Sequence, residues 1–153
     1  MLEDPTLEPS VDFGLIADAV QAMAGKLFVM GGGWDTLWVR QLPARHHSLG
    51  IGLRLRIPWT HADEGIVLLI DLQDEDGASI FRTGPLRHNF TVRRPAGLPD
   101  GSDIGAVRAF TFNNVPFMKE GGFSFVISMD DIERKRIRFH VRTRPAPPTE
   151  GAS

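Results

Sequence analysis

The sequence predicts an all-β fold, an antiparallel β-sandwich of about eight or nine strands, from three observations. Short segments alternate apolar and polar residues, Gly, Pro and Asp separate these segments, and no segment is long and periodic enough to require a crossover helix. The clearest segment is residues 49–58, in which Leu49, Ile51, Leu53, Leu55 and Ile57 alternate with Gly50, Gly52, Arg54 and Arg56. A period of two is typical of a strand that buries one face.

The first elements are two strands in residues 12–24 and 26–30. Residues 12–24 also fit a helix, because Phe13, Ile16 and Val20 share a helical face, but the alternation of the odd-numbered apolar residues favours a strand. The second strand ends at three consecutive glycines, which allow a sharp turn or a bulge before Trp34.

The remaining strands follow at regular intervals. An acidic turn after Ile66, Leu68, Ile70 and Leu72 predicts a hairpin between residues 66–73 and 79–83. Further strands are predicted at residues 87–93, 104–113, 123–130 and 136–142, with a Pro- and Gly-rich loop over residues 94–101. This spacing predicts a sandwich of immunoglobulin-like, C2-like or jelly-roll type.

Length and composition predict one domain. The 153 residues, of which 42% are hydrophobic and 24% charged, are typical of a single globular core. We expect an acidic flexible arm at residues 1–11, the sandwich at 12–143 and a disordered Pro-rich tail at 144–153. The first ten residues carry no basic residue and no apolar run approaches a membrane span, so we expect a cytoplasmic protein that does not bind membranes.

Charge and motifs argue against several function classes. Lys and Arg total 17 against 19 Asp and Glu, so no global field draws the chain to nucleic acid. The absence of cysteine excludes a disulfide framework, a thiol nucleophile and a thiolate metal site. No His-Glu-x-x-His, Gly-x-Ser-x-Gly or phosphate-loop pattern occurs. We therefore predict a protein that is not an enzyme and needs no cofactor.

Two groups of residues are candidate contact surfaces. A row of basic residues, opposite the apolar side of residues 136–142, could meet a partner's carboxylates or phosphates; it consists of Arg134, Arg136, Arg138, His140 and Arg142. A solvated face, an edge strand protected by charge, or a clasp with the acidic arm would explain the same row. The indoles of Trp34, Trp38 and Trp59 fit a binding surface, an oligomer contact or caps on the core.

A third group fits a cation. Asp71, Asp74 and Asp76, with Asp130 and Asp131 from another turn, supply the oxygen ligands that calcium takes at loop ends. Acidic residues are also ordinary in hairpin turns, and the spacing is not that of an EF-hand.

Several strings resemble a family of small bacterial proteins catalogued only as a domain of unknown function. They are Ala17-Asp18-Ala19-Val20-Gln21, Gly25-Lys26-Leu27-Phe28, Gly31-Gly32-Gly33-Trp34-Asp35, Leu53-Arg54-Leu55-Arg56-Ile57-Pro58-Trp59 and Arg94-Pro95-Ala96-Gly97-Leu98-Pro99. The likeness spans about residues 13–142. It implies a bacterial source, as does the preference for Arg over Lys, and it carries no activity or site residue.

The function predicted from sequence is a non-enzymatic protein-interaction or assembly module whose partner is another protein or a second copy. The alternatives are a small-ligand or calcium-binding sandwich and, less favoured, nucleic-acid binding through the strand from Arg134 to Arg142.

Overall fold

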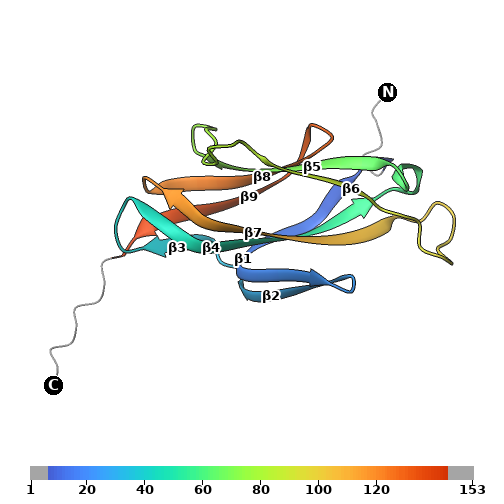
Figure 1. Ribbon diagram of the computed structural model, residues 1–153, viewed down its shortest axis with the longest axis horizontal. Coiled ribbons are helices and arrows are strands. Elements are labelled where there is room, and N and C mark those ends of the chain that lie inside the picture. The colour runs from blue at the N-terminus through green and yellow to red at the C-terminus, as the bar shows by residue number, and fades with distance from the viewer. Residues whose placement is uncertain (1–6, 145–153) are drawn as a thin grey trace, which may run out of the picture.

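The computed structural model describes residues 7–144, which form nine strands in two sheets (Figure 1). The strands are β1 (Ser10–Met23), β2 (Lys26–Gly32), β3 (Thr36–Val39), β4 (Ala44–Ile57), β5 (Gly65–Asp74), β6 (Leu86–Thr91), β7 (Ile104–Phe117), β8 (Gly121–Met129) and β9 (Ile132–Thr143). One sheet has the order β2-β1-β4-β7 and the other the order β3-β9-β8-β5-β6. The predicted all-β sandwich is confirmed.

The core lies between the sheets and uses alternate residues of the central strands. Every odd-numbered residue of β4 from Leu49 to Ile57 is 0% exposed, as the alternation predicted. From the facing sheet, Phe125 and Phe139 stack with ring centroids 5.8 Å apart. Burying each such side chain contributes about 1.5–3 kcal/mol, so this core holds the frame on which the surface features lie.

The segment after β5 differs from its prediction. Residues 79–83 are not a strand, because only an isolated bridge joins Gln73 to Ser79. The carboxylate of Asp74 accepts the N–H groups of Asp76 and Ala78 at 2.9 and 3.0 Å, and the Ser79 hydroxyl donates to Asp71 at 2.6 Å. These side-chain bonds hold the chain in a compact turn. The predicted hairpin with residues 79–83 is therefore wrong, and β5 pairs with β6 instead.

The short strand β3 has no counterpart in the sequence analysis. Its four residues pair in parallel with the end of β9, from Thr36 opposite His140 to Val39 opposite Thr143. The end of β9 is therefore paired on both sides, by β8 and by β3.

The strand β1 has two halves with different partners. Its first half pairs with β4 as far as Ala17, opposite Gly50, and beyond that point β1 pairs with β2 alone. The second half then runs back across the outer face of β4 and β7 and carries β2 with it, so the β1–β2 hairpin lies at one margin of the molecule (Figure 1).

Two glycines of β4 allow the hairpin to lie close to the sheet. A Cβ atom on Gly50 would lie 2.8 Å from a methyl carbon of Val20, and one on Gly52 would lie 3.0 Å from the other methyl carbon. Both glycines are buried beneath the hairpin, although the alternation had placed them on the polar face of β4. Side chains at these positions would push the hairpin outward.

No helix within residues 7–144 has the length and apolar character needed to cross a membrane.

Candidate interaction surface on the β1–β2 hairpin

A two-residue turn sets the geometry of the β1–β2 hairpin. Ala24 and Gly25 have φ angles of 50° and 72°, the positive pair that a type I′ turn requires. The turn places Met23 opposite Lys26. In such a hairpin the flanking residues form a hydrogen-bonded pair, and the alternation then directs the N–H and C=O groups of Leu27 and Val29 away from β1. These backbone groups form the outer edge of the sheet.

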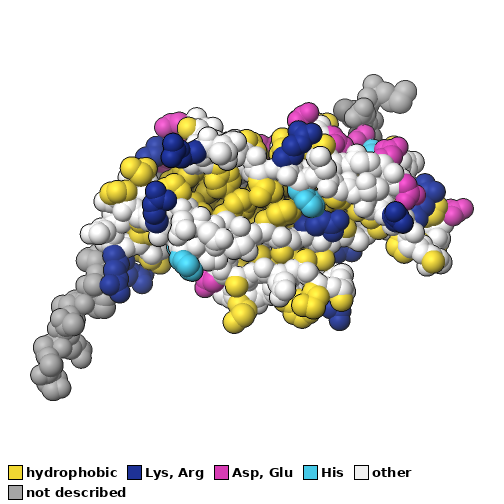
Figure 2. Space-filling model, in the orientation of Figure 1, with side chains coloured by type: hydrophobic (Ala, Val, Ile, Leu, Met, Phe, Trp, Pro, Cys, Tyr) yellow, Lys and Arg dark blue, Asp and Glu magenta, His cyan; other side chains and the backbone are white. Residues whose placement is uncertain are grey.

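The hairpin has one face toward the sheet and one toward solvent. Val20 and Leu27 lie on the inner face and pack over the glycines of β4. The outer face carries the apolar residues Ala19, Met23, Phe28 and Met30, which we call the hairpin patch. Met30 is 74% exposed, Met23 54% and Phe28 52%. Figure 2 shows hydrophobic side chains projecting from this margin of the molecule. Exposed apolar residues gathered in this way mark contact sites.

The outer edge of β2 lacks the protection that the other sheet edges have. Strand β7 carries Arg108 near its middle and an irregular Asn114, at φ 54°, and Pro116 near its end. Strand β6 has six residues and carries Arg87, and β3 has only four residues. Proline, charge, irregularity and short length each prevent one edge from pairing with another. In β2, Lys26 stands at the start and Gly31, at φ 65°, near the end. The four residues between them are apolar and regular.

The hairpin is also almost uncharged. Between residues 19 and 34 the only charged side chain is Lys26. An approaching partner therefore meets apolar side chains and free backbone groups, with little charge to desolvate.

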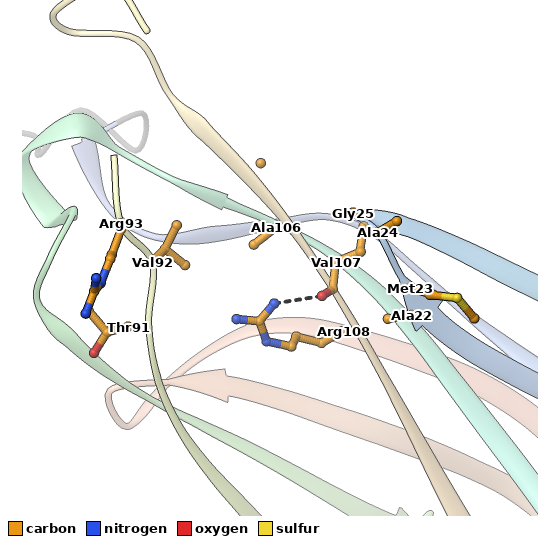
Figure 3. Close-up of a pocket in the computed structure, with 11 residues that line it drawn as sticks. Ala22, Met23, Ala24, Gly25, Thr91, Val92, Arg93, Ala106, Val107 and Arg108 are labelled. Atoms are coloured by element: carbon orange, nitrogen blue, oxygen red, sulfur yellow. Dashed lines mark hydrogen bonds between the residues drawn. The ribbon is translucent and has the colours of Figure 1, made fainter. Parts of the chain in front are cut away.

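A hollow lies at the tip of the hairpin (Figure 3). The turn residues form one wall, and the end of β6 with the start of β7 forms the other; its volume is about 510 Å³. Arg93 and Arg108 line it, and no acidic side chain does. The guanidinium of Arg108 donates to the carbonyl of Val107 at 2.8 Å, and burial lowers the pKa of that guanidinium. Met23 belongs to both this hollow and the hairpin patch, so the two features are continuous.

Four members of the predicted basic row alternate regularly along β9, namely Arg136, Arg138, His140 and Arg142, whereas Arg134 lies at a register shift between β8 and β9. Arg134 is half-buried and pairs with Glu8 of the N-terminal arm at 3.7 Å, while Arg136 pairs with Glu133 at 2.7 Å. Arg138, His140 and Arg142 are exposed. The ion pair of Glu8 with Arg134 is thus one contact between the acidic arm and the basic row. The rest of the arm, residues 1–6, lies outside the described part of the chain. The middle of the row also borders the acidic turn after β5.

The three tryptophans do not share one surface. Trp34 packs edge-on against Phe139, with centroids 6.0 Å apart, and donates its indole N–H to the carbonyl of Gly31 at 2.9 Å. Trp38 is 47% exposed and lies under the guanidinium of Arg144 at 4.0 Å. Trp59 lies past the far end of β4, whose 14 residues span about 45 Å. Trp34 is therefore a cap on the core, and Trp59 lies far from Trp38.

The acidic residues at the end of β5 and in the turn after it already have partners. Asp71 accepts from Ser79 and, at 3.0 Å, from Gln73, and Lys119 lies 3.5 Å from Asp74 and 3.7 Å from Asp76. The N–H of Ala78, followed by that of Asp76 and by Lys119, lowers the pKa of Asp74.

Asp130 does not join this acidic group. It accepts the N–H of Val67 near the start of β5, whereas Asp74 ends the strand. Among the described residues, no three His, Asp or Glu side chains are placed to share a metal ion.

The hairpin patch was not among the surfaces predicted from the sequence. The available signal was the run Leu27, Phe28, Val29 and Met30, which is apolar at both odd and even positions. A strand of that kind is either buried on both faces or exposes an apolar face. An edge strand cannot be distinguished from a central one by such a run alone.

Comparisons with known proteins leave the activity open. No curated protein matches the sequence. An immunoglobulin-like protein from Pseudomonas aeruginosa is similar, with a TM-score of 0.38 and 11% identity over 91% of this chain and 100% of that chain. A β-glucuronidase of glycoside hydrolase family 2 is similar over 90% of this chain and 11% of that chain, with a TM-score of 0.32 and 12% identity.

The family predicted from sequence is confirmed. A family model matches residues 12–142, and the resemblance was expected over about residues 13–142. The chain belongs to that family, which is described as a family of unknown function (DUF6941).

Proposed function

We propose that this protein is a protein-interaction module that binds an extended strand of its partner along the outer edge of β2. The observation that carries the proposal is the unprotected, apolar edge of β2 beside the exposed hairpin patch. Strand addition to a sheet edge is a general mode of protein recognition, in which the backbone supplies hydrogen bonds and flanking side chains supply specificity.

The energetics favour this surface over the basic row. Covering Phe28 and Met30 removes apolar area from water, and because they are 52% and 74% exposed, each contributes a part of the roughly 1.5–3 kcal/mol that full burial of an exposed side chain supplies. Arg134 and Arg136, in contrast, already pair with Glu8 and Glu133. A partner at the row would have to replace these contacts, and exposed ion pairs contribute little.

A photo-cross-linking experiment tests the proposal. A photoreactive amino acid is placed at Met30, and the same amino acid at Met118 gives the matched control, because the two side chains are 74% and 71% exposed. In native cells we expect an adduct of defined mass from position 30 and none from position 118. Adding Val29→Pro removes an outward N–H without breaking the β1–β2 ladder, and the adduct should disappear. No adduct at position 30, or the same adduct at position 118, would refute the proposal.

A second candidate function, small-ligand binding, is favoured by a hollow beside the turn after β5. Phe81 and Phe112 stack at 4.9 Å on its floor, and Arg45 and Arg82 line it without any acidic residue; its volume is about 430 Å³. That size and lining fit a small anion with an apolar body.

Two matched probes test this second function. Octanoate should raise the thermal unfolding temperature, because a ligand that binds only the folded state stabilises it, and octylammonium should not. The stabilisation should fall in Arg82→Ala. Equal responses to both probes would rule out an anion site.

A further inference from the structure

We propose that the partner at β2 is a second copy of this chain, and that the two β2 strands pair antiparallel about a two-fold axis at Phe28. This inference rests on the proposed function and names its partner. The two four-stranded sheets of the copies would then join into one continuous sheet.

The backbone of β2 suits this register. Hydrogen-bonded pairs across an antiparallel interface join residues whose N–H and C=O groups both point outward. In β2 these residues include Leu27 and Val29, so Leu27 of each copy pairs with Val29 of the other. Phe28 then stands opposite itself in a non-hydrogen-bonded pair, where side chains approach most closely. The paired segment ends before Gly31, whose positive φ interrupts the regular strand.

The side chains of the patch are complementary in the same register. Phe28 meets Phe28 of the second copy, and aromatic pairs across strands are favourable. Lys26 stands opposite Met30, so its aliphatic stem covers the thioether while its ammonium stays in water. The patches of both copies then adjoin on one face of the joined sheet, which also carries Gln21 and Lys26 of each copy.

Charges do not oppose this contact. Lys26 is the only charged residue of β2, and the two-fold axis separates the two lysines because they lie at opposite ends of the paired segment. The carboxylate of Asp18 lies against Gly31, where a Cβ atom would collide with it. Each Lys26 therefore approaches the end of the other copy that carries Asp18, so opposite charges come together.

The structure favours a second copy over an unrelated strand, because the β2 edges of two copies are identical and therefore match in shape, length and register. Within residues 7–144, β2 offers a regular, apolar edge of four residues from Leu27 to Met30, and the same four residues of a second copy match it in length and register. In a two-fold interface, each contact between two different residues also occurs a second time with the two copies exchanged. Contacts that are weak singly are therefore doubled.

Light scattering over a range of concentrations tests the dimer. The full chain should have a mass that approaches twice 16.9 kDa as the concentration rises. Met30→Lys and Val29→Pro should each raise the dissociation constant about tenfold or more, because one adds charge and the other removes an edge hydrogen bond. The matched control Met118→Lys should leave the dissociation constant unchanged. Circular dichroism of each variant establishes that it is folded.

A single cysteine tests the register. The chain has no cysteine, so Phe28→Cys introduces the only thiol. Opposed residues in a non-hydrogen-bonded pair have Cα atoms about 4.5 Å apart, which a disulfide bridges, so mild oxidation should give a covalent dimer. Val29→Cys and Met118→Cys should cross-link far more slowly, because neither residue lies opposite itself.

The outcomes separate this inference from the proposed function. A strict monomer, or a dimer that Met30→Lys and Val29→Pro leave unchanged, overturns the self-pairing. In that case an adduct at position 30 with a different protein would still support strand binding at β2. Faster cross-linking of Val29→Cys than of Phe28→Cys would overturn the register at Phe28.

Discussion

The β1–β2 and β8–β9 hairpins have the same type of turn, but their solvent-facing surfaces differ, because one is apolar and the other is charged. Ala24-Gly25 and Asp130-Asp131 both adopt two consecutive positive φ angles. In β9, Ile137, Phe139 and Val141 face the core and the opposite face is charged, whereas β2 is apolar on both faces and carries one lysine. Turn geometry makes a hairpin in both places. The pattern of charge along the strands decides whether a hairpin completes the core or offers a surface for contact.

The largest difference between the hairpins should appear on truncation of an aromatic residue. Phe139→Ala should lower the free energy of unfolding by about 3–5 kcal/mol, because the ring packs against Phe117, Phe123 and Phe125. Phe28→Ala should cost less than about 1 kcal/mol, because the ring is 52% exposed. Urea unfolding of dilute protein measures both effects without a contribution from association. Similar losses would mean that Phe28 also belongs to the core.

The next effect concerns the contact between the hairpin and the sheet. Gly50→Ala should cost about 1–3 kcal/mol, because the new methyl group would lie 2.8 Å from Val20. Gly65→Ala is the matched control, because a Cβ atom there meets nothing within 4 Å. Amide hydrogen exchange should show faster opening of β2 in Gly50→Ala while β8 keeps its protection. Unchanged exchange in β2 would contradict the packing of the hairpin on β4.

Sequence analysis predicted the parts of this fold that depend on local pattern. The alternation of β4 predicted its buried residues, and Asp74 with Gly77 predicted a turn. It assigned residues 79–83 to a strand because alternation cannot reveal that Asp71 and Asp74 bind the following chain. It missed β3, whose four residues are held by the distant end of β9.

The candidate surface could not be predicted from local sequence pattern either, because it depends on contacts between distant segments. Gly50 and Gly52 occupy the polar face of β4 in the alternation, and they are buried because a segment more than twenty residues earlier folds back over them. Which face of the hairpin remains exposed depends on that long-range contact. The run of four apolar residues in β2 indicated a strand but not its place at the edge of the sheet.

A smaller effect should follow from the turn residues. Ala24 has a φ angle of 50°, which an alanine adopts at a cost of about 1–2 kcal/mol and an asparagine at less. Ala24→Asn should therefore stabilise the protein by about 0.5–1 kcal/mol in thermal or urea unfolding. Asp130→Ala, the reverse change in the β8–β9 turn, should destabilise it further, because Asp130 also accepts the N–H of Val67 at 2.9 Å. A loss of stability in Ala24→Asn would contradict the type I′ turn.

The smallest effect is a dependence on pH that belongs to the charged hairpin. The Arg136 guanidinium, which donates a hydrogen bond to Glu133, lowers the pKa of that carboxyl below its ordinary value. A carboxyl with a lowered folded-state pKa contributes stability above its unfolded pKa, about 4.3, and loses that contribution as the pH falls through the folded pKa. Wild type should therefore exceed Glu133→Gln in unfolding free energy at pH 6 and converge with it below pH ~3.

Changes in the β1–β2 hairpin should behave differently with pH. Met30→Ala alters no titratable group, so its effect on unfolding free energy should be the same at pH 6 as at pH ~3. Urea unfolding of dilute wild type, Glu133→Gln and Met30→Ala at both pH values measures the contrast. If the difference in unfolding free energy between wild type and Glu133→Gln stays constant with pH, the Glu133–Arg136 contact does not distinguish the charged hairpin from the apolar one. Solvent would then screen this exposed ion pair so strongly that it contributes little.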